Sequence, residues 1–297
     1  MIRRQDLSVL SIYYLKYSAI RNLFLRLQNK PVTRILAFHE ISNESLNYFE
    51  ANLRFLAKNT NVVSFEDFFS GNLSSKRINV IITFDDGYKN WMTNAIPVLK
   101  QFKLPATFFV TSGFVDLSKA DAADFNKTKL HRPVGQEYII EGLLGKDLLR
   151  MIEKGFTIGG HTVNHSNLGM IQDRIRLRNE IVEDKDRLEK MAGVRIQYFA
   201  YPGGVYFSPF VNIPEVLKDA GYQGAVTTIR GFNTDRTDPY LLRRELTRAS
   251  MPKQVFRARV YGNYDLVSSI KNFLSGLPKG NANKARRTPT RSAGQNF

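Results

Sequence analysis

Short apolar runs alternate with amphipathic stretches along most of this chain. The runs are rich in β-branched and aromatic residues, which predicts strands, whereas apolar residues at three- and four-residue spacing predict helices. The predicted strands are 35–38, 62–65, 78–84, 106–110, 156–158, 196–200 and 223–228, and the predicted helices are 48–58, 90–102, 148–154, 174–191 and 214–220.

The order of these elements predicts the fold class. Repeated strand–helix units are typical of a parallel α/β fold. The run 78–84 is almost continuously apolar, as expected of a parallel strand that is covered on both faces. The number of units in a chain of 297 residues favours a closed or nearly closed (β/α) barrel over an open sheet. The stretch 113–145 is weakly patterned and predicts a long loop, which in a compact domain is usually functional or mobile.

The two ends of the chain differ from the middle. Residues 7–28 have one apolar face bordered by Lys16, Arg21 and Arg26, which predicts an amphipathic helix. That helix either packs on the domain or lies on the cytoplasmic leaflet as an interfacial anchor. Residues 278–297 have almost no apolar content and predict a disordered tail. We therefore expect a basic helical segment at 1–30, one domain at 31–277 and a basic tail at 278–297.

The positive charge is concentrated at these ends. Residues 1–30 hold six basic residues and one acid, and residues 278–297 hold five basic residues and no acid, so +10 of the net +16 lies outside the predicted domain. A nucleic-acid partner would need a basic stripe across the fold, so this distribution argues against one. It suits an anionic membrane surface better, although basic termini also simply aid solubility.

The composition limits which side chains could bind a metal and bears on the expected cellular location. The chain has no cysteine, so a metal site must use nitrogen and oxygen ligands. We expect no secretory signal, because Asp6 and Lys16 interrupt the stretch behind the first residues and no small-residue cleavage site follows. No apolar run is long enough to span a bilayer. We therefore expect the protein to be cytoplasmic and peripheral on the inner face of the membrane.

Two short segments carry candidate chemistry. Asp85, Asp86 and Gly87 follow the apolar strand 78–84, at the end where barrels hold their active sites, although Asp-Asp-Gly is also ordinary turn chemistry. His161 and His165 follow the strand 156–158. At this spacing on a helical turn they would share one face. A pair of surface histidines that forms no site would show the same spacing. Together, one carboxylate and two imidazoles form a three-ligand catalytic metal site, and the second carboxylate is free to act as a general base.

These segments carry a family resemblance. Thr-Phe-Asp-Asp-Gly at 83–87, His-Thr-Val-Asn-His at 161–165 and Tyr-Pro-Gly-Gly at 201–204 resemble the polysaccharide deacetylases with a NodB homology domain, carbohydrate esterase family four. The resemblance covers residues 31–250, and its first two motifs are specific in combination. It implies a distorted (β/α) barrel of about seven strands, in agreement with the pattern of elements.

The resemblance also implies roles. Asp85 would be the catalytic base, and Asp86, His161 and His165 would bind a divalent metal, usually Zn²⁺. The same donors also suit Co²⁺, Ni²⁺ or Fe²⁺. The backbone N–H matching Gly203, beside Tyr201 and Pro202, would stabilise the oxyanion. The reaction implied is metal-assisted hydrolysis of an N-acetyl group.

Two positions depart from the family pattern. Ala200 stands where the family has an Arg that holds the catalytic carboxylate; Arg243 or Arg244 could replace it, or the pair could face solvent. The late histidine that serves as general acid is missing. His39, at the end of the strand 35–38, is the remaining candidate, unless it is only packed there. His131 stays unassigned.

The function expected is deacetylation of an N-acetylated sugar in a nucleotide-linked, lipid-linked or growing glycan, in bacterial polysaccharide biosynthesis. Two alternatives remain open. A glycan-binding protein that keeps the barrel without turnover would explain the missing Arg and late histidine. A deformylase or another amidase on a modified sugar would use the same chemistry with a different acyl pocket.

Overall fold

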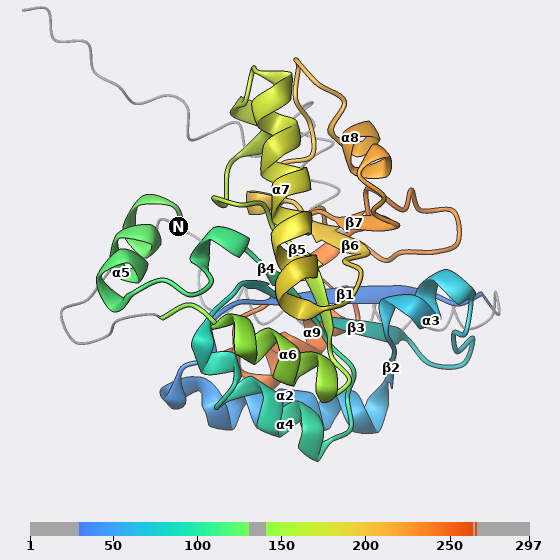
Figure 1. The fold of residues 1–297 in the computed structure, drawn as a ribbon. Coiled ribbons are helices and arrows are strands. Elements are labelled where there is room, and N and C mark those ends of the chain that lie inside the picture. The colour runs from blue at the N-terminus through green and yellow to red at the C-terminus, as the bar shows by residue number, and fades with distance from the viewer. Residues whose placement is uncertain (1–29, 131–140, 264, 266–297) are drawn as a thin grey trace, which may run out of the picture.

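The fold is a parallel sheet that curls into a nearly closed barrel with helices around it (Figure 1). The computed structural model describes residues 30–130, 141–263 and 265. The strands are β1 (Thr33–Phe38), β2 (Asn61–Val62), β3 (Asn79–Asp86), β4 (Thr107–Val110), β5 (Thr157–Gly160), β6 (Tyr198–Ala200), β7 (Gly224–Val226) and β8 (Arg244–Leu246). Seven follow one another in the order β7-β6-β5-β4-β3-β1-β8, and β2 pairs with β3.

The gap between the two edge strands is bridged by backbone hydrogen bonds. Leu242, just before β8, donates its N–H to Ala225 at 3.0 Å, and Thr227 donates to Leu242 at 2.8 Å. This parallel bridge links β7 to the segment entering β8. The predicted distorted (β/α) barrel of about seven parallel strands is confirmed.

The helices lie around the sheet. They are α2 (Leu46–Asn59), α3 (Phe65–Ser70), α4 (Ala95–Gln101), α5 (Lys119–Thr128), α6 (Gly145–Glu153), α7 (Arg174–Ala192), α8 (Ile213–Asp219) and α9 (Lys253–Val260), with short 3₁₀ turns η1 (Asn43–Ser45), η2 (Lys89–Trp91), η3 (Ser112–Phe114), η4 (Leu168–Met170) and η5 (Pro202–Gly204). In Figure 1, α2, α4 and α6 cover one side of the sheet, and α7 and α8 lie on the other.

Side-chain alternation divides the core in two. On β3, Val80, Ile82 and Phe84 belong to the large cluster beneath the helices. Ile81 belongs to a smaller cluster with residues of β1, β4, β6 and β7, which fills the barrel. Alternate residues of a strand point to opposite sides, so Thr83 and Asp85 follow Ile81 toward the interior.

Helix α3 corrects the prediction at 62–65. The strand ends at Val62, and Phe65 begins a helix instead. Ser64 caps it by accepting a hydrogen bond from the Asp67 N–H, while the Asp67 carboxylate accepts one from the Ser64 N–H. Such a capping box fixes a helix start. Phe65 then stacks on Tyr198 at 4.8 Å between ring centroids, at the start of β6, so α3 closes the barrel end opposite the carboxyl ends of the strands.

Other elements also differ from the prediction. The predicted helix 90–102 is divided into η2 and α4, and the predicted loop 113–145 contains α5. β8 and α9 had no counterpart among the predicted elements. The end of α7 agrees with the prediction, because Gly193 has a φ of 68° and caps the helix in the left-handed region.

Three expectations fall outside the described residues: the helix at 7–28, the tail at 278–297 and the position of His131. Among the helices that the structure does describe, none is long and apolar enough to cross a bilayer.

Candidate active site

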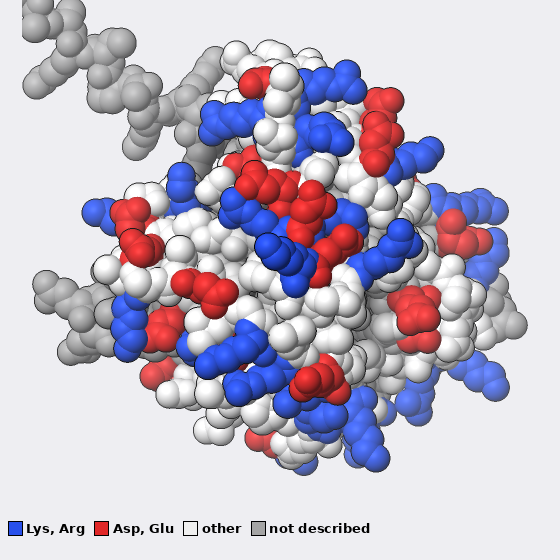
Figure 2. Space-filling view, in the orientation of Figure 1, with Lys and Arg blue, Asp and Glu red and all other residues white. Residues whose placement is uncertain are grey.

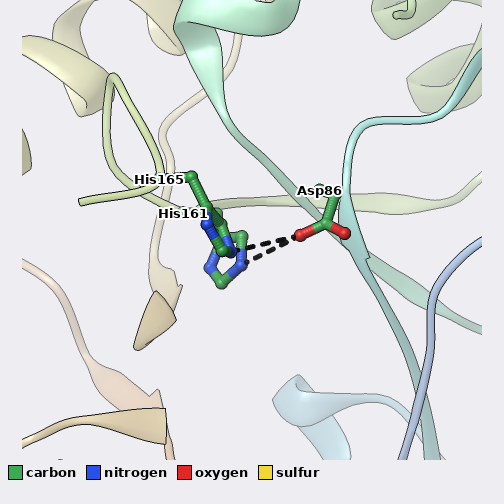
Figure 3. Close-up of side chains that lie close together, drawn as sticks. All are labelled: Asp86, His161 and His165. Atoms are coloured by element: carbon green, nitrogen blue, oxygen red, sulfur yellow. Dashed lines mark ion pairs between the residues drawn. The ribbon is translucent and has the colours of Figure 1, made fainter. Parts of the chain in front are cut away.

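Three of the predicted site residues meet at the carboxyl ends of β3 and β5. His161 Nε2 lies 3.5 Å from Asp86 Oδ1, and His165 Nε2 lies 3.4 Å from the same oxygen (Figure 3). One ligand atom from each residue lies within 4.8 Å of the others. The structure therefore brings together the three residues that the sequence analysis assigned to the metal.

The histidines do not lie on a helical turn, and this part of the prediction was wrong. Residues 161–165 form a loop in which Thr162 has a φ of 67° and His165 a φ of 52°. Non-glycine residues in the left-handed region cost free energy and persist only where the surroundings hold them. The irregular loop brings the two imidazoles to 5.0 Å between ring centroids.

The two neighbouring carboxylates reach the site because the strand ends irregularly. Asp85 continues the inward alternation of β3, and the next residue would normally point to the other side. Asp86 instead has a φ of 93°, and Gly87 has a φ of 109°. This distortion turns Asp86 toward the histidines while Asp85 stays inside the barrel. Both side chains are almost fully buried.

Backbone carbonyls orient both imidazoles. His161 Nδ1 lies 2.7 Å from the carbonyl oxygen of Ala200, and His165 Nδ1 lies 3.3 Å from that of Lys129. A carbonyl only accepts hydrogen bonds, so Nδ1 carries the proton and Nε2 is left toward Asp86. This arrangement of the second nitrogen is typical of metal-binding histidines. Two nitrogens and one carboxylate oxygen fit Zn²⁺ or a similar divalent ion.

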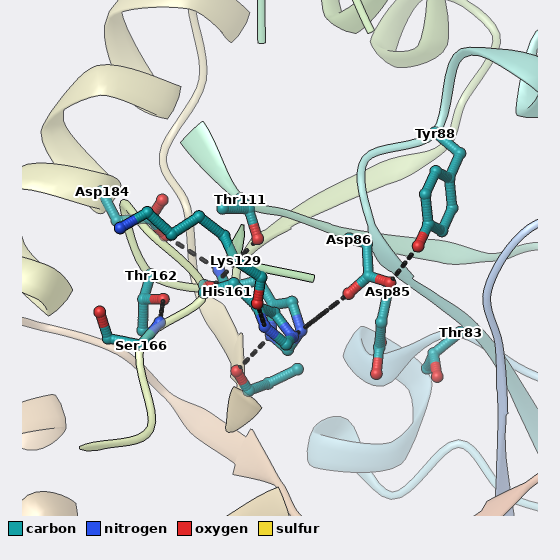
Figure 4. Close-up of polar contacts among 12 residues, drawn as sticks. Thr83, Asp85, Asp86, Tyr88, Thr111, Lys129, His161, Thr162, Ser166 and Asp184 are labelled. Atoms are coloured by element: carbon teal, nitrogen blue, oxygen red, sulfur yellow. Dashed lines mark hydrogen bonds and ion pairs between the residues drawn. The ribbon is translucent and has the colours of Figure 1, made fainter. Parts of the chain in front are cut away.

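Tyr88 supports Asp86. Its hydroxyl donates to Asp86 Oδ2 at 2.8 Å (Figure 4), on the oxygen that does not face the histidines. Burial alone would raise the pKa of the Asp86 carboxyl, but the hydrogen bond to His161 and the charges of His39 and His165 outweigh it. The pKa is held well below its usual range, so Asp86 is ionised.

The two histidines differ in their affinity for a proton. Burial lowers the pKa of His165 to about 4. Burial also acts against the proton on His161, but the hydrogen bond to Asp86 and the charges of Asp85 and Asp86 raise its pKa above the usual value. A proton bound at this site without metal therefore resides on His161.

Two acids on α7 hold the histidine loop. Asp184 accepts the His161 N–H at 2.9 Å and the Ser112 N–H at 3.0 Å, and burial raises its pKa to about 7. One turn earlier, Glu180 accepts the N–H and the side-chain amide of Asn164, at 3.0 and 2.9 Å. Because these acids accept the backbone N–H groups of His161 and Asn164, they fix a loop that has no regular structure of its own.

Arg244 supplies a guanidinium to Asp85. Its Nη1 donates to Asp85 Oδ1 at 2.7 Å, and its Nε donates to the Thr227 carbonyl at 2.9 Å. Burial alone would raise the pKa of Asp85, but Arg244 and His161 reverse the effect and lower it. Arg243 precedes it in the chain and is exposed, so the structure does not bring Arg243 to the site.

The remaining candidates lie around this centre. His39 is partly buried and is close enough for its charge to lower the pKa of both Asp85 and Asp86. Tyr201 and Pro202 are buried after β6, whereas Gly203 is exposed with a φ of 61°. The hydroxyl of Tyr201 donates to the Tyr240 carbonyl at 2.9 Å.

Sequence reasoning missed Tyr88, Glu180 and Asp184. Tyr88 lies two residues beyond Asp86, but many aromatic residues in the chain have no such role. Glu180 and Asp184 are four residues apart on α7, where their burial contrasts with the other charges of that helix. An acid at an otherwise apolar position of an amphipathic helix was the available signal.

Comparison with known proteins identifies the family. The family model described as polysaccharide deacetylase matches residues 73–225, just over half of the 297 residues. The chain belongs to the polysaccharide deacetylase family. The match contains all three residues of the Asp86, His161 and His165 cluster, and a deacetylase family indicates a hydrolase.

Individual relatives of the family are distant. The Bacillus subtilis protein YxkH, provisionally named a polysaccharide deacetylase, is 27% identical over 61% of this chain and 56% of its own length. The peptidoglycan-N-acetylmuramic acid deacetylase PdaA of the same organism is 27% identical over 56% of this chain and 51% of its own. The chain thus spans about half the length of these curated relatives.

Solved structures support the fold. A polysaccharide deacetylase from Bacillus cereus superposes with a TM-score of 0.61 at 22% identity, covering 78% of this chain and 69% of that one. IcaB from Ammonifex degensii gives the same TM-score and identity, and the match covers 78% of this chain and 97% of that protein. At this identity the likeness concerns the barrel alone.

Proposed function

We propose that this protein is a metal-dependent N-deacetylase that removes acetyl groups from an N-acetylated sugar in a glycan or glycolipid precursor. The observation that carries the proposal is the meeting of Asp86, His161 and His165 beside a buried carboxylate, Asp85, that a separate arginine holds. Asp86 lies beside the two histidines, which suits a metal ligand. Asp85 is held by the arginine instead, which suits a general base.

The ligand residues would be Asp86, His161 and His165, with Zn²⁺ as the most suitable ion and Co²⁺, Ni²⁺ or Fe²⁺ as alternatives. When bound there, such an ion supplies Lewis-acid polarisation of the acetamido carbonyl and lowers the pKa of water. The three side chains suit this role because both Nε2 atoms and Asp86 Oδ1 point to one space.

The other residues would transfer protons, orient the general base and bind the oxyanion. Asp85 is ionised because its pKa is lowered, so it can accept a proton from the attacking water. Arg244 fixes its orientation through the 2.7 Å contact. We propose His39 as the donor to the departing amine, and the exposed backbone at Gly203, next to Tyr201 and Pro202, as the oxyanion donor.

The substrate is an N-acetylated carbohydrate, in keeping with the family. PdaA, one of the relatives, is named for N-acetylmuramic acid in peptidoglycan, which supports a sugar amide as the scissile group. The proposal includes a location on the inner face of the membrane, where the basic segment 1–30 would contact anionic lipids near a lipid-linked or growing glycan.

The test combines metal analysis with acetate release. Purified full-length protein should contain a divalent ion and release acetate from at least one nucleotide-linked, lipid-linked or oligomeric N-acetylhexosamine. A chelator should abolish release, and Zn²⁺ or Co²⁺ should restore it.

Matched variants separate the assigned roles. His165→Gln should lose metal and activity together. Asp85→Asn should keep the metal and lose acetate release, whereas His39→Gln should keep the metal and lower kcat. Metal without acetate release from any substrate would favour the glycan-binding alternative, and formate release from N-formyl sugars would favour the deformylase.

A further inference from the structure

Three large apolar side chains protrude from one end of the molecule. Ile175 is 72% exposed, Phe207 69% and Met170 66%. These are the highest values for large hydrophobic side chains in the described part of the chain. We call these three residues the apolar tip. Isolated exposed hydrophobic residues are ordinary, but a gathered group marks an interaction surface.

The members of the apolar tip come from two neighbouring segments, η4 with the start of α7 and the loop after η5. A Cβ at Gly169, within η4, would lie 2.6 Å from Val205 Cγ1 and 2.7 Å from the Phe207 carbonyl. Met170 is the next residue, and Ile175 follows in the first turn of α7. In Figure 1, α7 begins at the top of the view, beside the segment that leads into α8. Phe210, 52% exposed, belongs to the same segment.

Three arginines lie beside the apolar tip at the start of α7. Arg174, Arg176 and Arg178 are all exposed in the first turns of α7. None of them forms an ion pair with a carboxylate of the described residues. The positive end of the helix dipole disfavours cations there, and the only acid between 167 and 178 is Asp173. Figure 2 shows an uncharged surface at the top of the molecule with Lys and Arg on both sides and some acidic residues among them. Asp173 caps the start of α7 and lines one hollow with Arg176, Glu180 and Glu183, so these carboxylates offset part of the positive charge without forming an ion pair with the three arginines.

We propose that the apolar tip rests on an anionic lipid surface. Apolar side chains that enter the headgroup region, flanked by basic residues that bind anionic headgroups, are typical of interfacial membrane contacts. An anionic lipid surface would bind both kinds of side chain, because its acyl region can bury the apolar residues and its headgroups can pair with the arginines.

The position of the apolar tip would bring the membrane close to the candidate site. It is built from the segments that follow β5 and β6, and His161 and His165 lie in the first of these segments. A membrane bound there would lie beside the end of the barrel that holds the candidate site. The contact does not depend on the proposed deacetylase activity, because lipid binding is measured without substrate.

The absence of cysteine from the chain allows a direct test. The full-length variant Phe207→Cys is labelled with an environment-sensitive fluorophore and mixed with vesicles of phosphatidylglycerol and phosphatidylcholine. The matched control is Leu149→Cys on α6, which is 45% exposed. A blue shift at position 207 and none at 149 is expected. No shift at 207, or equal shifts at both positions, would overturn the proposal, whatever the basic termini bind.

A second measurement tests the charges. Replacing Arg174, Arg176 and Arg178 by Gln should lower partition into the anionic vesicles by about fivefold for each arginine. Replacing the exposed Lys146 and Lys154 by Gln is the control and should change it far less. Equal losses in both proteins, equal binding to pure phosphatidylcholine, or a blue shift at 207 caused by a soluble N-acetylated oligosaccharide without vesicles would each contradict an anionic lipid contact.

Discussion

Arg244 donates to Asp85 across the barrel at 2.7 Å, although 159 positions separate the two residues in the chain. Both belong to strands that pair with β1, and the register sets Arg244 opposite Ile35. The family pattern would take the arginine from position 200, at the end of β6. Here the guanidinium comes from β8, on the other side of the site. It holds Asp85, the carboxylate that the family arginine would hold.

The pair is buried on both sides, so its removal should be costly. We expect Arg244→Gln to lower the free energy of unfolding by about 3 kcal/mol, because it leaves the Asp85 charge buried without its partner. Acetate release should fall on the order of 10²-fold, since the general base is no longer held. Urea unfolding and turnover measure the two effects.

Arg243→Gln is the matched control for this prediction. Its side chain is exposed, so stability should change by less than about 0.5 kcal/mol and turnover should stay near that of the wild type. Equal effects of the two substitutions would show that the contact between Arg244 and Asp85 does not support the site.

The sequence predicted what depends on local pattern. Apolar runs mark the strands at 35–38 and 78–84 because buried parallel strands need such residues on both faces, and repetition of the units led to the barrel. The first two motifs led to Asp86, His161 and His165 for the same reason: polar residues directly after a buried strand lie at one end of the barrel.

What the sequence did not predict depends on exact backbone geometry. Arg243 and Arg244 are chemically equal, and only the pairing register of the three-residue strand β8 decides which one faces the interior. The φ of 93° at Asp86 is set by the surrounding fold. Likewise, the histidines share a face through two left-handed residues rather than through a helical turn, so the correct pairing followed from a wrong local structure.

Tyr88 offers a test of support for the metal ligands. Tyr88→Phe removes the hydroxyl that donates to Asp86 Oδ2 and keeps the buried ring. Loss of such a supporting hydrogen bond typically weakens metal binding by about 10- to 100-fold, while stability should fall by only about 1 kcal/mol. Titration with Co²⁺, followed by its absorption spectrum, measures the affinity. An unchanged affinity would mean that Asp86 needs no support from Tyr88.

Asp184 should matter to the same ligands through the backbone. Asn at this position can accept only one of the two N–H groups, from His161 or Ser112, and turns its own NH₂ toward the other. We expect a loss of about 1–3 kcal/mol in unfolding free energy together with weaker Co²⁺ binding.

Glu183→Gln, on an exposed position of the same helix, is the control for Asp184→Asn and should alter neither quantity. If Asp184→Asn lowers stability while the affinity and spectrum of bound Co²⁺ stay the same, the acid stabilises α7 without positioning His161.

The last prediction concerns protons at the site without metal. Imidazole NMR of the metal-free protein should show His161 gaining its proton above pH 6.5, because Asp86 and Asp85 raise its pKa. His165 should stay neutral until about pH 4, since burial lowers its pKa. Below its raised pKa, His161 has to lose this proton when metal binds, so calorimetry in buffers of different ionisation enthalpy should detect proton release that declines as the pH rises through the pKa of His161. Two histidines that titrate together near pH 6.5 would contradict the unequal burial and charge that the structure gives them.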